Sequence, residues 1–267
     1  MHALYFGPSD APLLGLYHAA VHARPRRGVL LCYPGPEEAM RVHWAYRNLT
    51  QLLLSNGFHV FRFDYYGTGD SSGPSGEGGI HRWNHDIQLA AQEFCALADV
   101  EVMNLVGARL GASMVATVPL DLSDVKVAHR ILWDPVINGA DYLLQLEGLQ
   151  HQRIANSRYP LERLLDPQAA EALGYPLKPL VTASIRQLDL LTQPLATAQR
   201  ITVLTSTPCA EGGLVHQLLN KHINMEHTTV DEPCHWSTQE VLEQALLPTQ
   251  IIKHIGDLLT QSSGEDV

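Results

Sequence analysis

One arginine lies where the sequence pattern changes from strand to helix. Arg109 stands between Gly107 and Gly111, after the apolar run 100–107 and before the helical pattern 111–120. An arginine side chain carries N–H donors and no lone pair, so it acts as neither nucleophile nor general base. At the first turn of a helix, its charge adds to the unpaired backbone N–H groups and the helix dipole. The sequence therefore predicts a site for an anion, such as a carboxylate, a phosphate or a developing oxyanion.

Other side chains with nucleophilic or metal-binding chemistry are scattered along the chain. Ser113 lies one helical turn after Arg109, where we expect a small packing residue. His81 and His85 are one turn apart, but a metal needs more ligands, so we expect a solvated helix face. The cysteines form no CxxC pair, so we expect free, unreactive thiols and neither zinc nor structural disulfides. They are Cys32, Cys95, Cys209 and Cys234.

Apolar runs and helical patterns alternate along the chain and must position these residues. Two runs, 2–7 and 13–20, flank a Pro-Ser-Asp turn and predict an antiparallel hairpin. Further strands, mostly apolar throughout as in parallel strands covered on both faces, are expected at 28–34, 58–64, 100–107, 129–136, 200–206 and 225–230. Helices are expected at 39–56, 80–98, 111–120 and 237–261, the last opened by a capping box at 237–240. The alternation predicts an α/β fold with a mostly parallel open sheet and helices on both faces.

The segment 137–195 departs from this alternation. It contains helical stretches and no convincing strand, and it is interrupted by Pro160, Pro167, Pro176 and Pro179. We expect a helical lid here, inserted into an α/β core formed by 1–136 and 196–267. An insertion over the carboxyl ends of strands commonly determines which ligand binds.

Composition narrows the classes of partner. The chain has 267 residues, 45% of them hydrophobic, which is enough for a large core. Its net charge is -10 with acidic and basic residues well mixed, so we expect neither nucleic acid nor anionic lipid as a partner. The first residues lack a signal-peptide pattern, and no apolar run approaches the length of a membrane span. We therefore expect a soluble cytoplasmic protein.

Five stretches of the sequence resemble the α/β-hydrolase superfamily, in particular its bacterial branch near the serine aminopeptidases and the exosortase-associated hydrolases. They are 6–20, 32–73, 104–113, 132–146 and 234–238, which together span nearly the whole chain. The most specific stretch is RFDYYGTGDSSG at 62–73, whose glycines open a polar loop and not a helix, so we expect no phosphate cradle there. The resemblance implies the α/β-hydrolase fold.

The resemblance also implies where the reacting groups lie. In this superfamily the nucleophile is the central residue of G-x-S-x-G, on a sharp turn called the nucleophile elbow. Here Arg109 replaces that serine between the two glycines, which closes the ordinary acyl-enzyme route at this position. The oxyanion-binding N–H groups would come from Leu110 and from Gly35, with Glu37 in the same turn as Gly35.

The remaining members of a catalytic triad are assigned in the same way. His235 occupies the loop before the last helix, from which such hydrolases present their histidine. Its acid partner has two alternatives, Glu211 after the strand 200–206 and Asp134 after the strand 129–136.

Two functions follow from these assignments. In the first, Arg109 clamps an anion and keeps His235 neutral, and His235 acts as general base on an acyl ester, a thioester or a related carboxyl-bearing metabolite, free or carrier-bound. This enzyme would carry out hydrolysis, acyl transfer or proton transfer without a metal or other cofactor. In the second, Arg109 pairs with an acidic neighbour, and the chain is a non-catalytic pseudo-hydrolase with a binding or regulatory role. The sequence leans slightly to the enzyme, because the glycines, His235 and the lid pattern occur together.

Overall fold

The computed structural model describes residues 1–21, 26–122, 124–157, 171–207, 209, 212–222, 224–236 and 245–261. The strands are β1 (His2–Phe6), β2 (Leu13–His18), β3 (Arg27–Cys32), β4 (His59–Phe63), β5 (Val102–Ala108), β6 (Lys126–Trp133), β7 (Glu171–Ala172), β8 (Tyr175–Pro176), β9 (Arg200–Ser206) and β10 (Met225–Val230). The helices are α1 (Pro36–Ser55), α2 (Ile80–Ala98), α3 (Leu110–Thr117), α4 (Gly139–Ala155), α5 (Pro179–Arg186), α6 (Gly212–Lys221) and α7 (Thr249–Gln261).

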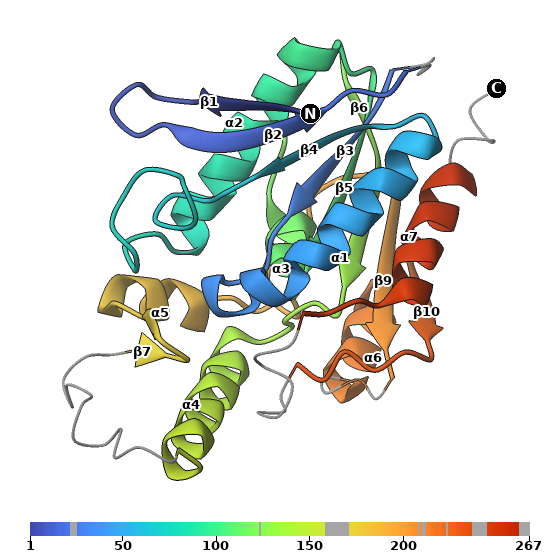
Figure 1. The fold of residues 1–267 in the computed structure, drawn as a ribbon. Helices are drawn as coiled ribbons and strands as arrows, with labels where there is room; N and C mark the ends of the chain where they lie inside the picture. The colour runs from blue at the N-terminus through green and yellow to red at the C-terminus, as the bar shows by residue number, and fades with distance from the viewer. Residues whose placement is uncertain are drawn as a thin grey trace.

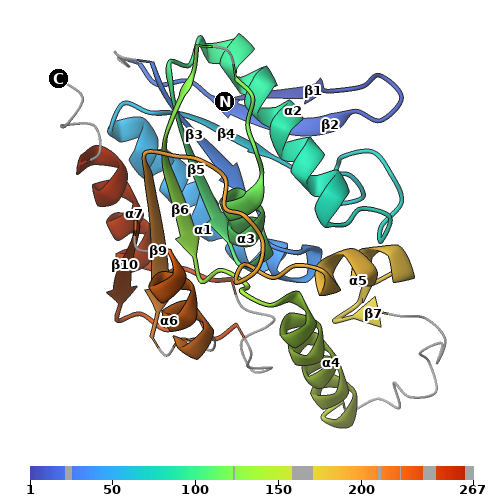
Figure 2. The same cartoon turned by 180° about the vertical axis from the view of Figure 1, so that it is seen from behind.

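In this part of the chain, eight strands form one mixed sheet in the order β1-β2-β4-β3-β5-β6-β9-β10. Along this order, each pair of neighbouring strands after β4 is parallel, whereas β1 pairs with β2, and β2 with β4, in antiparallel fashion. Helices α1 and α7 lie side by side on one face (Figure 1), and α2 and α3 cover the other (Figure 2). The α/β architecture predicted from the sequence is confirmed, including the hairpin at the start of the chain.

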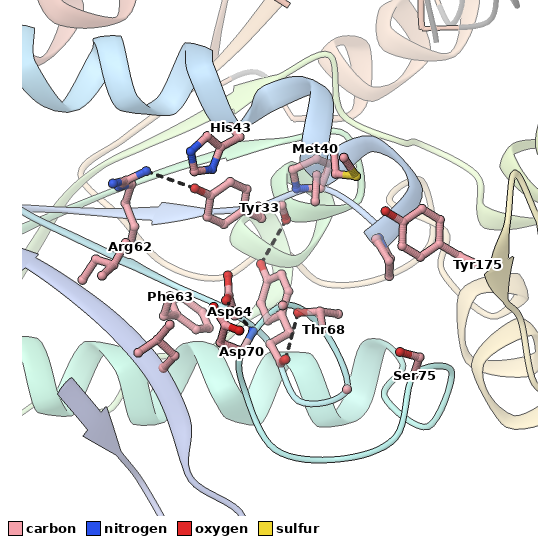
Figure 3. A pocket seen from close by; sticks show the side chains of 18 of the residues that line it. Tyr33, Met40, His43, Arg62, Phe63, Asp64, Thr68, Asp70, Ser75 and Tyr175 are labelled. Carbon is pink, nitrogen blue, oxygen red and sulfur yellow. Dashed lines mark hydrogen bonds between the residues drawn. The ribbon is translucent and has the colours of Figure 1, made fainter. Parts of the chain in front are cut away.

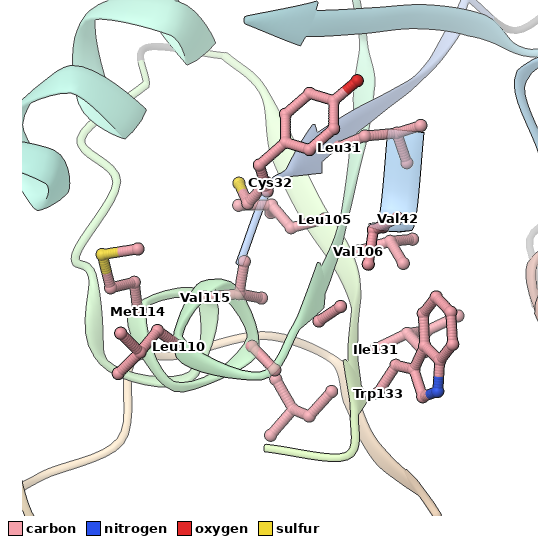
Figure 4. Packing of buried hydrophobic residues seen from close by; sticks show 14 of the residues in the cluster. Leu31, Cys32, Val42, Leu105, Val106, Leu110, Met114, Val115, Ile131 and Trp133 are labelled. Carbon is pink, nitrogen blue, oxygen red and sulfur yellow. The ribbon is translucent and has the colours of Figure 1, made fainter. Parts of the chain in front are cut away.

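The core explains why the central strands are apolar throughout. Leu31, Val106 and Ile131 stand in register on β3, β5 and β6, and none of them is exposed to solvent. Val42 of α1 lies beside this row on one face, and Met114 and Val115 of α3 lie on the other (Figure 4). A central strand covered on both faces therefore carries no alternation of polar and apolar residues. This packing holds the carboxyl end of β5, and the turn that follows it, in a fixed place.

Three expectations about element boundaries need correction or cannot be checked. Helix α1 begins at Pro36, three residues before the expected start, because proline suits the first helical position. The last helix begins at Thr249 and not at 237: residues 245–248 are not helical, and 237–244, with the capping box, lie outside the described residues. The segment 137–195, for which the sequence predicts a helical lid without strands, does contain a strand pair, β7 and β8, joined by Leu173 and Gly174, both with positive φ as in tight hairpin turns.

The segment between β6 and β9 contributes α4 and α5. Asn138 caps α4, its side-chain oxygen accepting the N–H groups of Ala140 and Asp141 at 2.9 and 3.1 Å. Both helices lie near the carboxyl end of the sheet, below the start of α1 and beside α3 (Figures 1 and 2). Tyr142 on α4 is buried there, which connects this segment to the turn after β5.

Candidate functional site

The turn after β5 has the strained backbone of a nucleophile elbow. Arg109 has φ 52° and ψ -122°, a conformation that a non-glycine residue rarely adopts. A Cβ atom on Gly107 would lie 2.4 Å from the Gly111 carbonyl oxygen, and one on Gly111 would lie 2.2 Å from that of Tyr33. Both glycines are therefore required by the close approach of backbone to backbone, as their spacing in the sequence predicts.

Arg109 is buried, with 3% of its surface exposed, and its guanidinium already has partners. Its Nε donates to Glu38 Oε1 at 3.1 Å, and its Nη1 donates to the Asp134 carbonyl oxygen at 3.2 Å. The guanidinium carbon also lies over the rings of Tyr142 and Trp236, at 5.6 and 5.5 Å from their centroids. The positive charge thus meets a carboxylate of the same chain.

Two buried carboxyl groups and a phenol surround this ion pair. The Tyr142 hydroxyl lies 3.2 Å from Glu38 Oε2 and also contacts Glu37 Oε1. Burial and the neighbouring charge of Glu38 raise the pKa of Glu37 to about 7. A phenol has only one proton to donate, so a protonated Glu37 can in turn donate to the Tyr142 oxygen. The two acidic residues at the start of α1 therefore share one hydrogen-bonded cluster with Arg109.

Asp134, one of the two predicted acids, lies at the end of β6 with φ 43°. Its Oδ1 accepts the backbone N–H of Ser206 at 2.8 Å, and its Oδ2 accepts the Ser206 hydroxyl at 2.7 Å. Oδ2 also accepts the indole N–H of Trp236 at 2.7 Å. The indole thus bridges Asp134 and Arg109, as an imidazole bridges acid and nucleophile in a Ser-His-Asp triad. An indole nitrogen donates a proton to a hydrogen bond but cannot accept one.

His235 precedes Trp236, and its side chain is exposed. Its φ is 48°, and its carbonyl oxygen accepts Arg41 Nη1 at 3.4 Å. Arg41 Nη2 also binds the Cys234 carbonyl oxygen at 3.0 Å, and the Arg41 guanidinium carbon lies 5.4 Å from the Trp236 ring centroid. The backbone of 234–236 is therefore fixed by Arg41, with Trp236 turned inward and His235 outward.

The predicted oxyanion residues lie beside the elbow. Gly35 is the N-cap of α1, and Leu110 is the first residue of α3. A Cβ atom on Gly35 would lie 2.6 Å from Glu37 Oε1, so the Glu37 carboxyl group folds back over this turn. An acidic side chain thus occupies space next to one of the two predicted donors.

The other candidate residues are placed as follows. Ser113 is buried, and its hydroxyl donates to the carbonyl oxygen of Val136 at 2.6 Å, which is a packing role. Burial raises the pKa of Cys32 and Cys234 to about 12 and that of Cys95 to about 11, so these thiols stay protonated near neutral pH. His81 and His85 are exposed on α2, and Glu211 lies outside the described residues.

Two members of the cluster, Glu38 and Trp236, were not singled out from the sequence. Glu38 is 71 positions from Arg109 along the chain, and acidic residues at a helix start are common for reasons of the helix dipole alone. Trp236 adjoins the histidine that the sequence favours, and only the backbone conformation decides which of the two side chains points inward. No local pattern carries that information.

Comparison with known proteins identifies the fold. No protein-family profile matches the sequence, and no curated protein is found to be similar to it. Among solved structures, Est1E from Butyrivibrio proteoclasticus with ferulic acid bound has a TM-score of 0.66 at 14% identity, covering 98% of this chain and 100% of that one. Proline iminopeptidase from Mycobacterium smegmatis has a TM-score of 0.64 at 12% identity, covering 100% of both chains.

A third similar structure, the alpha/beta hydrolase domain-containing protein 10 from mouse, has a TM-score of 0.59 at 16% identity, covering 98% of this chain and 99% of that one. These likenesses show that the chain has the α/β-hydrolase fold, as the sequence predicts. Within the described residues, no helix is both long and apolar enough to cross a lipid bilayer.

Proposed function

We propose that this chain is a pseudo-hydrolase, a protein that uses the α/β-hydrolase fold to bind a small molecule without forming an acyl-enzyme. The observation that carries the proposal is the buried ion pair between Arg109 and Glu38 at the elbow. Of the two functions that follow from the sequence, this geometry favours the second.

The charge of Arg109 is the first reason. An anion clamp must offer its guanidinium to a ligand, but here Glu38 holds Arg109 Nε, with both side chains at most 4% exposed. A ligand carboxylate would have to share the guanidinium with Glu38 or displace it, and displacement would leave the Glu38 carboxylate buried without this cation. Breaking a buried pair in this way costs about 3–5 kcal/mol. The role of Arg109 as an anion clamp remains a prediction, and this cost weighs against it.

The second reason is that the groups at Asp134 are poorly suited to take up a proton from the elbow. General base catalysis at an elbow needs a neutral nitrogen that accepts a proton and an acid that orients it. Asp134 is already bound by Ser206 and by the indole of Trp236, which has no lone pair to offer. Trp236 therefore cannot relay a proton between the elbow and Asp134 as an imidazole would.

The segment 137–195 has a place in this proposal. Its Tyr142 contacts both Glu37 and Glu38 and lies under the Arg109 guanidinium. We therefore propose that α4 serves as a lid whose inner face is tied to the elbow. A cytoplasmic location and a carrier-bound acyl ligand remain predictions from the sequence.

A second candidate function is the enzyme with Arg109 as anion clamp and His235 as general base, acting on an acyl ester, a thioester or a related carboxyl compound. The retained elbow favours it, because φ 52° at Arg109 stores strain of about 1–3 kcal/mol. In a catalyst such strain is part of the mechanism. For this candidate, Arg109 has to leave Glu38, and His235 has to turn toward the ligand.

Turnover measurements separate the two candidates. Wild type, His235→Ala and the matched control His81→Ala, an exposed histidine on α2, are assayed with p-nitrophenyl butyrate and with an acyl-coenzyme A thioester. The pseudo-hydrolase is expected to show no turnover above the buffer rate in all three, and no fluorophosphonate adduct by intact mass. Turnover in wild type and His81→Ala that is lost in His235→Ala would overturn the proposal and establish the enzyme.

A further inference from the structure

A large pocket opens beside the start of α1, between that helix, the end of β4 and the loop 64–75. Its volume is about 620 Å³, within the range of sites that hold organic ligands. Figure 3 shows Met40 and His43 entering from α1, Arg62 and Phe63 from β4, and Tyr175 from the opposite side. Neither Arg109 nor Trp236 is among the residues that line it.

The walls of this pocket are mainly apolar and aromatic. They include Leu14, Leu16, Met40, Trp44, Phe63 and Tyr65. Met40 and Trp44 are large hydrophobic side chains that remain 74% and 46% exposed on α1. These walls suit a ligand with an apolar body, since covering such side chains removes apolar surface from water.

One lining residue, Arg62, is a buried cation that forms no ion pair with any residue that the structure describes. It is 4% exposed, its Nη1 donates to the Tyr33 hydroxyl at 3.2 Å, and its Nη2 lies 3.4 Å from His18 Nε2. Its Nε has no hydrogen-bond partner in the described part of the chain. Burial and the Arg62 charge lower the pKa of His18 to about 4, so its imidazole is neutral near pH 7 and does not compensate the charge. Burying an arginine with neutral partners alone is costly, and an anionic partner would offset that cost.

The other charged and titratable groups of the pocket are compatible with an anion at Arg62. Asp64 stands two residues further along, but its Oδ2 accepts the Asp70 N–H at 3.0 Å and faces the backbone of Gly69. Burial is the main cause that raises the pKa of Asp64. Asp70 itself is exposed at the loop, and burial lowers the pKa of His43, which is therefore neutral near pH 7. Asp64 interacts with the charge of Arg62 but forms no ion pair with it in the described part of the chain, so the guanidinium can still take an anionic ligand as a direct partner.

We propose that this pocket binds a small organic carboxylate with an apolar body, its carboxylate on Arg62 and the Tyr33 hydroxyl and its body between Met40, Trp44 and Tyr65. The inference goes beyond the proposed function, because it rests on residues other than Arg109 and the groups that bind it at the elbow. It holds whether or not the elbow is catalytic.

The charge of the ligand is tested with two probes of nearly equal shape, 4-phenylbutyrate and 4-phenylbutan-1-ol, by titration calorimetry with the full chain. Wild type is expected to bind the carboxylate at least tenfold more tightly than the alcohol, since hydrogen bonds to a charged group are the stronger ones. Arg62→Met is expected to remove this preference. The matched control Arg130→Met, which removes another buried arginine that binds only carbonyl groups, is expected to keep it.

The place of binding is tested without any variant by labelling the methionine methyl groups with ¹³C. The carboxylate is expected to shift the Met40 resonance, at the pocket, and to leave that of Met114, on the helix after the elbow, unchanged. A shift at Met114 alone would place the ligand at the elbow and overturn the inference. Equal affinity of wild type for 4-phenylbutyrate and 4-phenylbutan-1-ol would overturn it as well. So would a failure of wild type to bind, at millimolar concentration, both 4-phenylbutyrate and octanoate, a second carboxylate with an apolar body.

Discussion

Removing the Arg109 side chain should destabilise the fold strongly if the residue is part of the structure. Arg109→Met keeps the aliphatic length of the side chain but leaves Glu38 as a buried carboxylate, its side chain 4% exposed, without the guanidinium. The cost of such an unpaired buried charge is about 3–5 kcal/mol. For a chain of this size, a loss of 1 kcal/mol lowers Tm by about 2–4 °C, so a fall of roughly 6–20 °C is expected.

The partner variant completes a double-mutant cycle. Glu38→Gln neutralises the carboxylate, and the double variant Arg109→Met, Glu38→Gln removes both charges at once. Because the single variants each leave one uncompensated charge, the double variant should cost less than their sum, by about 2 kcal/mol or more. The measurement is the free energy of unfolding from urea titration at pH 8, with the slope against urea checked for each variant.

An exposed ion pair serves as the control. Lys178 Nζ and Glu77 Oε1 are 2.7 Å apart, but their side chains are 46% and 44% exposed. Lys178→Met should therefore cost less than about 1 kcal/mol. If Arg109→Met cost no more than this control and showed no coupling with Glu38→Gln, Arg109 would be available to a ligand, and the reasoning for a pseudo-hydrolase would fail.

Three further predictions concern the same cluster and the elbow. A carboxyl group with a raised pKa binds its proton more tightly in the folded state, so Glu37 should lower stability as pH rises from about 4.5 to about 7. Glu37→Gln should remove that loss, making the variant more stable than wild type by roughly 3 kcal/mol at pH 8 but not at pH 4, as measured by urea titration. Gly111→Ala would bring a methyl group to 2.2 Å from the Tyr33 carbonyl oxygen, so little soluble protein is expected by size-exclusion chromatography. Arg109→Ser should gain no fluorophosphonate adduct by intact mass, because the indole of Trp236 cannot take the serine proton; an adduct would show that another base is within reach.

The sequence predicts the fold well because its evidence is local. Apolar runs predict the eight strands of the main sheet, and helical periodicity predicts the helices between them. The glycines around Arg109 predict the elbow, because the backbone there leaves no room for a side chain. The elements that the sequence does not predict are those for which this local evidence is missing or ambiguous. Strands β7 and β8 have two residues each, too few for any periodicity, and the helical pattern before Thr249 did not identify where α7 begins.

The candidate site was predictable only in part, for a different reason. Which residues surround the elbow follows from the order of the strands, and Asp134 and Gly35 do lie there. Which atoms meet depends on backbone conformation: at φ 48° for His235, it is the next side chain, Trp236, that reaches Asp134. The partner of Arg109 depended on tertiary packing, which brings the first turn of α1 against the elbow.

A retained elbow is weak evidence for catalysis in this fold, because its glycines are required by packing whether or not a nucleophile stands between them. Gly111 approaches the Tyr33 carbonyl so closely that the turn cannot relax without moving β3. What distinguishes a catalyst is a group near the elbow that can accept a proton and return it. In the described part of the chain, Trp236 contacts the Arg41 and Arg109 guanidiniums and the Asp134 carboxylate, and its indole only donates. Glu37, with a pKa raised to about 7, can exchange a proton, but its contact is with Tyr142. Each charge in the cluster is stabilised by a neighbour, so restoring a serine would not by itself restore a triad.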